Sequence, residues 1–182
     1  MSIAIATGNY TLDASHSQVG FVARHVMVTK VRGAFNDVTG TGYFDADDVS
    51  KSHAEVVIKA ASIDTRNADR DAHLRSNDFF DMDTYPEIRF DTTAVELLDD
   101  THLRVRGDLT IKGVTRPVTI DFEYTGSAVD PYNNQRVGFE GSVEVNRKDW
   151  GLNWNAPLEA GGVLISEKVT LEFELSAIKD AA

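Results

Sequence analysis

The chain has no cysteine among its 182 residues. This composition excludes disulfide bonds, thiolate metal sites and a cysteine nucleophile. Positive charge is also scarce, because 18 lysines and arginines stand against 29 aspartates and glutamates and give a formal net charge of −11. Nucleic acid is therefore not an expected partner, since phosphate backbones bind basic surfaces. Loose adsorption to anionic lipid headgroups is disfavoured for the same reason.

Long apolar runs are missing as well. No stretch approaches the ~18 consecutive apolar residues of a membrane-spanning helix, so we expect no stable membrane insertion. The first residues, MSIAIATGNYTLD, have neither a basic leader nor a long apolar core, and we therefore read no signal peptide and expect a cytoplasmic location. The length suits a single domain over residues 1–182, large enough for a core or an enclosed cavity.

What the chain has in abundance is alternation of apolar and polar residues. The clearest stretches are HLRVRGDLTIK (102–112), VTIDFEY (118–124) and VTLEFEL (169–175). Such alternation is typical of strands with one buried and one solvated face, which can pack as a sandwich or close as a barrel. Long strands with an interior glycine, such as Gly107, favour closure. We predict an all-β fold, an antiparallel β-barrel of about eight strands.

One segment, RNADRDAHLRSNDFF at about 66–80, breaks the alternation. Asn67 is a plausible N-cap and aspartates follow in the first turn, so we predict a short helical insertion. Asp69 and His73 are four residues apart and could share a helix face as two metal ligands, but a metal site needs a third. No metal site is therefore predicted. We expect the helix to cross one end of the barrel and turn its apolar side chains inward.

Residues for catalysis are not evident. His16 and Ser17 are adjacent, and adjacent residues on a strand point to opposite faces. No G-x-S-x-G elbow and no phosphate-binding glycine loop is present. We predict no catalytic residue and no cofactor.

His25 shares an alternating face with Val19, Phe21 and Ala23. If that face is interior, its imidazole points into an apolar environment and needs a partner from the wall or from a ligand. Phenylalanines occur on nearly every predicted strand. They could fill a solid core or line a slot for a lipid, and alternation does not separate these readings.

Five segments together resemble the YceI family. They are YTLDASHSQVGFVARH (10–25), VRGAFNDVTGTGYFD (31–45), ASIDTRNADRDAHLRSNDFFDMDTYPEIRF (61–90), GDLTIKGVTRPVTI (107–120) and NRKDWG (146–151). The resemblance implies a lipocalin-like barrel with a long hydrophobic cavity, in which family members carry polyisoprenoid or other long-chain amphipathic ligands. Many members of the family are exported, whereas we read no export signal here.

The leading hypothesis is non-enzymatic binding, transport or storage of a long-chain lipid, in which each buried methylene contributes about 0.8 kcal/mol. The predicted ligand-binding residues are Phe21, His25, Phe35, Ile58, Leu74, Phe79, Phe80, Phe90, Leu109, Ile120, Phe122 and Phe139. Arg24, Arg70 and Arg75 are further candidates for contact with the polar headgroup. The alternatives are an enzyme that uses His25 or His73 as acid or base, and a stress-related barrel with a solid interior. Exposed strand edges could also pair two copies into a homodimer.

Overall fold

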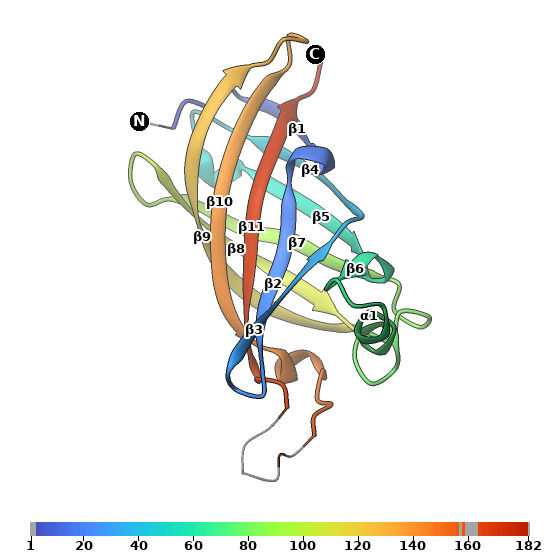
Figure 1. Cartoon of the computed structure of the whole chain (residues 1–182). Helices are drawn as coiled ribbons and strands as arrows, with labels where there is room; N and C mark the ends of the chain where they lie inside the picture. Colours follow the sequence, from blue (N-terminus) through green and yellow to red (C-terminus); the bar gives the residue numbers. More distant parts are fainter. Residues whose placement is uncertain (1–2, 157, 159–163, 182) are drawn as a thin grey trace.

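The computed structural model describes residues 3–156, 158 and 164–181. In this part of the chain, eight strands close into an antiparallel barrel, as predicted (Figure 1). In spatial order they are β1 (Gly8–Leu12), β4 (Val38–Phe44), β5 (His53–Lys59), β7 (Glu87–Leu97), β8 (His102–Ile111), β9 (Val114–Val129), β10 (Gln135–Asn146) and β11 (Lys168–Lys179). Pairing of β1 with the end of β11 closes the ring.

Three further strands extend the barrel at one end. After a single 3₁₀ turn, η1 (Ala14–His16), strand β2 (Gln18–His25) continues along β11 where β1 stops. A hairpin then leads into β3 (Thr29–Phe35), which pairs with the short β6 (Ile63–Asp64). The other 3₁₀ turns are η2 (Val49–Lys51), η3 (Ala60–Ser62) and η4 (Arg147–Trp150).

The predicted helical insertion is present as α1 (Ala68–Arg75). The side chain of Asn67 caps it by accepting a hydrogen bond from the backbone N–H of Arg70 at 2.9 Å. In Figure 1, α1 lies at the same end of the barrel as the β2–β3 hairpin and η4, and we call this the lower end. The β9–β10 turn and the C-terminus lie at the opposite, upper end (Figure 1).

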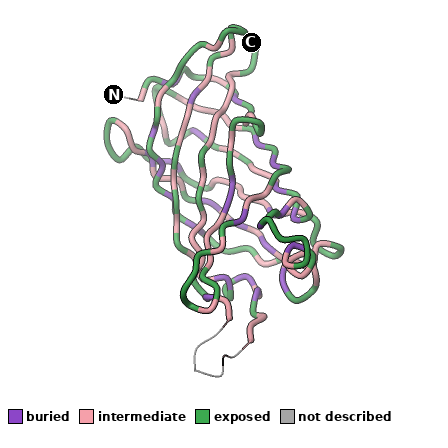
Figure 2. Tube along the Cα trace, in the orientation of Figure 1, coloured by how far each residue is buried: buried purple, intermediate pink, exposed green. Residues whose placement is uncertain are grey.

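Alternation in the sequence matches alternation in the structure. Along β9, Val118, Ile120, Phe122 and Tyr124 are buried and the residues between them are exposed. The same pattern gives short buried segments along the strands in Figure 2, with exposed residues gathered in turns. Apolar side chains from the inner face therefore meet inside the barrel, as period-two burial requires.

Phenylalanine rings pack against glycines on the inner face of the barrel. A Cβ atom at Gly33 would lie 2.3 Å from Cζ of Phe21, its partner on β2. A Cβ atom at Gly107 would lie 2.4 Å from Cζ of Phe90. The rings therefore lie directly on the backbone of the neighbouring strand, which is the close approach expected of a glycine within a curved strand.

A network of charged side chains connects the segment after β1 to the C-terminal strands β10 and β11. Arg136 of β10 donates from Nη1 to Asp13 Oδ2 at 2.6 Å and from Nε to Asp130 Oδ2 at 2.7 Å. Asp13 caps η1 and its backbone N–H bonds to Ser176 of β11. The pKa of Asp13 is lowered first of all by the hydrogen bond from Arg136. The pKa of Asp130 is lowered first by the backbone N–H of Asn134, and also by Arg136.

Replacing Arg136 with methionine should lower stability at neutral pH. Both carboxyl groups have a lowered pKa in the folded state, so their contribution is complete above an unfolded pKa of about 3.9 and is lost as the pH falls further. Urea unfolding at pH 7 measures the loss. Arg104→Met, which breaks an exposed ion pair with Asp121, is the control and should change stability less. An Arg136→Met deficit no larger than that of Arg104→Met would contradict this assignment.

Candidate functional site: an apolar cavity within the barrel

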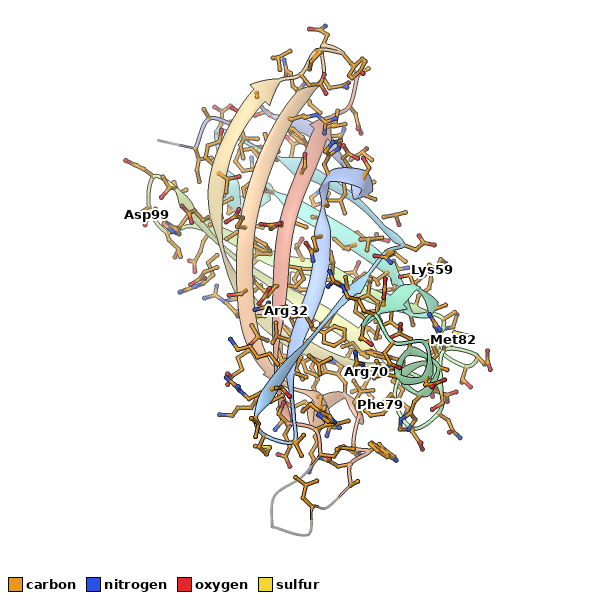
Figure 3. All side chains as sticks on the ribbon, in the orientation of Figure 1. Arg32, Lys59, Arg70, Phe79, Met82 and Asp99 are labelled. Atoms are coloured by element: carbon orange, nitrogen blue, oxygen red, sulfur yellow. The ribbon has the colours of Figure 1, made fainter. Side chains whose placement is uncertain are left out.

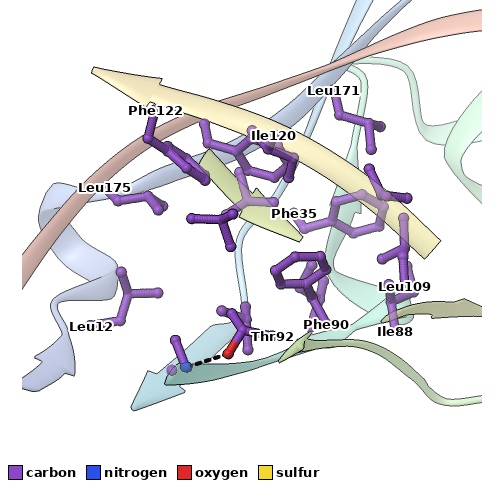
Figure 4. Close-up of a pocket in the computed structure, with 18 of the residues that line it drawn as sticks. Leu12, Phe35, Ile88, Phe90, Thr92, Leu109, Ile120, Phe122, Leu171 and Leu175 are labelled. Carbon is purple, nitrogen blue, oxygen red and sulfur yellow. Dashed lines mark hydrogen bonds between the residues drawn. The ribbon is translucent and has the colours of Figure 1, made fainter. Parts of the chain in front are cut away.

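The interior of the barrel is hollow. A cavity of about 370 Å³ is lined by side chains from all eight barrel strands, from β2 and β3, and from the segments next to α1 and η4. Figure 4 shows part of its wall, with Ile120, Phe122 and Phe35 on one side and Phe90 and Ile88 on the other. The volume lies within the ~300–1,000 Å³ usual for ligand pockets. The wall is almost entirely apolar.

The predicted wall residues lie on this cavity, with the exception of His25. Those that line it are Phe21, Phe35, Ile58, Leu74, Phe79, Phe80, Phe90, Leu109, Ile120, Phe122 and Phe139. Alternation thus identified the inward face of each strand correctly. Leu74, Phe79 and Phe80 turn inward from α1 and the segment after it, as expected for a helix that crosses one end. Contact of these residues with a ligand stays a prediction.

The interior position expected for His25 is wrong. His25 is exposed and lies at the very end of β2, opposite Thr29. The residues that follow form the β2–β3 turn at the lower end of the barrel (Figure 1). His25 has the inward parity of Phe21 and Ala23, but the enclosed cavity stops before it. Parity identifies a face and does not reveal where the barrel ends.

The arginines considered for a headgroup also lie outside the cavity lining. Arg24 is exposed and donates to the carbonyl of Val28 at 3.2 Å. Arg70 of α1, labelled in Figure 3, donates from Nε to Thr65 Oγ1 at 2.7 Å and from Nη2 to the Thr65 carbonyl at 2.6 Å. Arg75 donates to the carbonyls of Ala61 and Ile63. Arg70 and Arg75 are thus engaged in tying α1 to the preceding chain, because backbone carbonyls there need donors.

Sequence reasoning missed the cation that does line the cavity, Arg147. It begins η4 at the lower end and is only 6% exposed. Its Nε donates to the carbonyl of Ser166 at 2.9 Å, and its Nη groups donate to the carbonyls of Leu152 and Ile165. Among the described residues no carboxylate forms an ion pair with it. Arg147 occurs in the segment NRKDWG, but nothing in its spacing marked it as buried.

Burial lowers the pKa of Arg147, and the nearby carboxylate of Glu167 acts in the opposite direction. A guanidinium nonetheless stays charged in proteins. The carbonyl oxygens that accept hydrogen bonds from Arg147 carry partial negative charge, but they do not neutralise the guanidinium. Arg147 therefore places a buried positive charge at the lower end of an otherwise apolar cavity.

Other polar groups of the wall are satisfied within the protein. Trp150 donates from Nε1 to the carbonyl of Leu109 at 2.9 Å. Thr92 accepts from the backbone N–H of Ala54 at 2.8 Å, the dashed line in Figure 4. Within the described chain, every buried side-chain nitrogen or oxygen has a hydrogen-bond partner. No polar atom of the wall therefore needs a ligand as a hydrogen-bond partner; Arg147 differs only in that its positive charge has no ion-pair partner among the described residues.

Three rings join α1 to the segment after η4. The ring centroid of His73 lies 4.6 Å from Trp154 and 5.1 Å from Phe79. His73 Nε2 also lies 2.8 Å from Asp78 Oδ2. His73 therefore packs against Phe79 and Trp154 at the lower end of the barrel and does not line the cavity. His25 does not line the cavity either. The two histidines considered for acid–base chemistry are both outside the enclosed space.

Within residues 3–156, 158 and 164–181, no group of three or more histidines, aspartates and glutamates could hold a metal ion. Over the same ranges, no helix has the length and apolar character needed to cross a bilayer.

A closed antiparallel barrel around an apolar cavity defines a lipocalin-like β-barrel protein. Within that class the chain belongs to the YceI-like family, because the YceI-like domain matches residues 10–177. A similar relative is the UPF0312 protein SA2479 of Staphylococcus aureus (strain N315), which is 39% identical over 170 residues, 93% of this chain and 95% of the relative.

Solved structures have the same fold. BcnA of Burkholderia cenocepacia has a TM-score of 0.80 at 23% identity, over 91% of this chain and 98% of BcnA. The YCEI protein of Campylobacter jejuni has a TM-score of 0.75 at 28% identity, over 87% of this chain and 90% of that protein. A polyisoprenoid binding domain from Saccharophagus degradans has a TM-score of 0.71 at 17% identity, over 94% and 98% of the two chains.

Proposed function

We propose that the protein binds one long-chain amphipathic lipid in its barrel cavity and serves as a carrier or store for it. The observation that carries this proposal is the apolar cavity of about 370 Å³ that runs between the two ends of the barrel. Desolvation of the chain supplies the affinity, at about 0.8 kcal/mol for each buried methylene. A polyisoprenoid is the chain we favour, and the Saccharophagus degradans domain of the same fold supports that choice.

The polar head of this lipid is assigned to the lower end, against Arg147. A buried guanidinium that has carbonyls but no carboxylate as partners favours an anionic group, because charge-assisted hydrogen bonds to a carboxylate or phosphate are the strongest it can form. Arg147 thus replaces Arg24, Arg70, Arg75 and His25 as the candidate for the headgroup. The chain would then extend upward past Ile120 and Phe122.

Native mass spectrometry of protein purified from its own host tests the proposal. We expect one lipid per chain, released on denaturation and extractable into organic solvent. Titration of lipid-free protein with a fluorescent prenyl or long acyl probe should give saturable one-to-one binding. A protein that carries no lipid and takes up neither probe would contradict the proposal.

We propose binding without turnover. Recovery of the lipid chemically unchanged after prolonged incubation with the protein supports this, and a modified lipid would favour the enzymatic alternative. The expected cytoplasmic location and a homodimer formed through strand edges stay predictions, testable by fractionation and by light scattering.

A further inference from the structure

The β2–β3 hairpin, residues 24–32, has an apolar tip in solvent. Met27 is 52% exposed and Val28 is 73% exposed. Val26 and Met27 adopt φ angles of 52° and 61°, a left-handed conformation that is unfavourable for a β-branched residue. The backbone N–H of Val26 bonds to the carbonyl of Leu164 at 2.8 Å and helps to hold the turn. The tip is therefore kept in a costly conformation that leaves its apolar side chains outside the barrel.

Cations flank this tip on the outer face of the hairpin. Arg24 is the direct register partner of Lys30, and Arg32 follows two residues later on the same face. Like charges directly opposite one another destabilise a strand pair. Arg32 forms an ion pair with Glu172 at 3.3 Å, whereas the described residues offer no such partner to Arg24 or Lys30.

The acidity of the rest of the chain makes this cluster more unusual. Residues 14–36 contain no aspartate or glutamate, although the chain has 29 of them in 182 residues. The hairpin is thus a local positive and apolar projection on a protein whose net charge is −11. Neither the barrel nor the cavity requires that combination.

The hairpin is joined directly to the lower end of the cavity. Ser166 donates its backbone N–H to the carbonyl of Arg24 at 3.0 Å, and its Oγ accepts from the N–H of Arg24 at 2.9 Å. The carbonyl of Ser166 accepts from Nε of Arg147 at 2.9 Å. One segment therefore connects the exposed cations of the hairpin to the buried cation of the cavity.

We propose that the β2–β3 hairpin docks the protein on the surface of an anionic lipid bilayer, with Met27 and Val28 inserted among the headgroups. Screening makes this compatible with the negative net charge, because charges farther than about 8 Å from the bilayer are largely screened at physiological ionic strength. Residues 14–36 contain no aspartate or glutamate, so the hairpin itself brings no carboxylate to the bilayer. Docking then brings the lower end of the cavity to the membrane, where a lipid could enter or leave. The inference extends the proposed function and does not depend on which lipid occupies the cavity.

Vesicle flotation tests the proposal with the full chain. Wild-type protein should bind vesicles of phosphatidylcholine and phosphatidylglycerol better than vesicles of phosphatidylcholine alone, and high salt should weaken binding. Met27→Ser with Val28→Ser should lower the partition coefficient by about tenfold or more, since two inserted apolar side chains are lost. Lys30→Gln should lower it by about fivefold, the effect of one cation near an anionic surface.

Matched changes at the upper end serve as controls. Val129 at the end of β9 and Tyr132 in the β9–β10 turn are 62% and 84% exposed, and their joint replacement by serine should leave vesicle binding unchanged. Lys51→Gln, in the β4–β5 turn, matches the charge change of Lys30→Gln and should also have no effect. Unchanged circular dichroism shows that each variant is folded.

Three outcomes would overturn the docking proposal. Wild-type protein could fail to float with either vesicle, the hairpin variants could bind as well as wild type, or the upper-end variants could lose binding equally. Uptake of the prenyl probe in the absence of vesicles is measured separately. Loss of probe uptake by wild-type protein contradicts the proposed function, whereas loss of flotation alone contradicts only the docking.

Discussion

Replacing Arg147 with methionine should lower the free energy of unfolding by about 2–4 kcal/mol. The guanidinium donates to the buried carbonyls of Ser166 and Leu152, and methionine leaves both without this donor. Removing a buried charge also relieves its desolvation, which keeps the loss below the sum of two unsatisfied groups. The carbonyl of Ile165 keeps a donor in Asn155 and should add little. Urea unfolding of lipid-free protein measures the change.

Arg147→Met should also weaken the binding of lipids with an anionic headgroup more than the binding of lipids with a neutral one. Affinity for a long-chain carboxylate or phosphate should fall by about 10- to 100-fold, the value of a hydrogen bond to a charged group, while affinity for the alcohol of the same chain should change much less. Arg147→Lys keeps the charge but loses the fork of donors, so its effects should be intermediate. Equal losses for charged and neutral lipids would show that Arg147 only supports the wall.

Replacing Ile120 with tryptophan should weaken binding of long chains about 100-fold. Ile120 lies inward from β9 and is 4% exposed, so an indole there occupies the cavity that a lipid needs (Figure 4). Displacing roughly three to four methylenes of a lipid costs about 100-fold in affinity. The cavity of about 370 Å³ provides room for the ring, so the loss in unfolding free energy should stay within the ~1–3 kcal/mol typical of overpacking.

The neighbouring position supplies the control for this experiment. Thr119 precedes Ile120 on β9 and is exposed on the outer face. Thr119→Trp adds the same ring outside the barrel and should leave probe binding unchanged. Titration of both variants with the prenyl probe compares them directly. Retained binding in Ile120→Trp would place the lipid outside this cavity.

The proposed chain site and the docking hairpin use different physical forces. Binding in the cavity depends mainly on apolar area, and its one electrostatic contact, with Arg147, is buried and is therefore screened little by salt. Docking depends on cations near an anionic surface and weakens as salt rises. Variants of Ile120 and of Lys30 should therefore affect separate measurements, which allows the two activities to be separated.

Much of the barrel followed from local pattern. The alternation around Ile120 and Phe122 predicted which side chains face inward, because successive residues of a strand point to opposite faces whatever the strand pairs with. Asn67 and the aspartates after it predicted where α1 begins, since a helix N-terminus leaves N–H groups that such side chains satisfy. These features depend only on neighbours in the chain.

Other features depend on residues that are distant in the chain. Tyr10 pairs with Lys179 to close the ring, and that pairing has no local signal. His25 has inward parity but lies beyond the enclosed cavity, and only the relative lengths of the assembled strands decide this. Arg147 is buried because the carbonyls of Leu152 and Ser166 converge on it. Local alternation specifies the two faces of each strand. Closure of the ring, the extent of the cavity and the burial of Arg147 follow from tertiary structure, because they require contacts between distant segments.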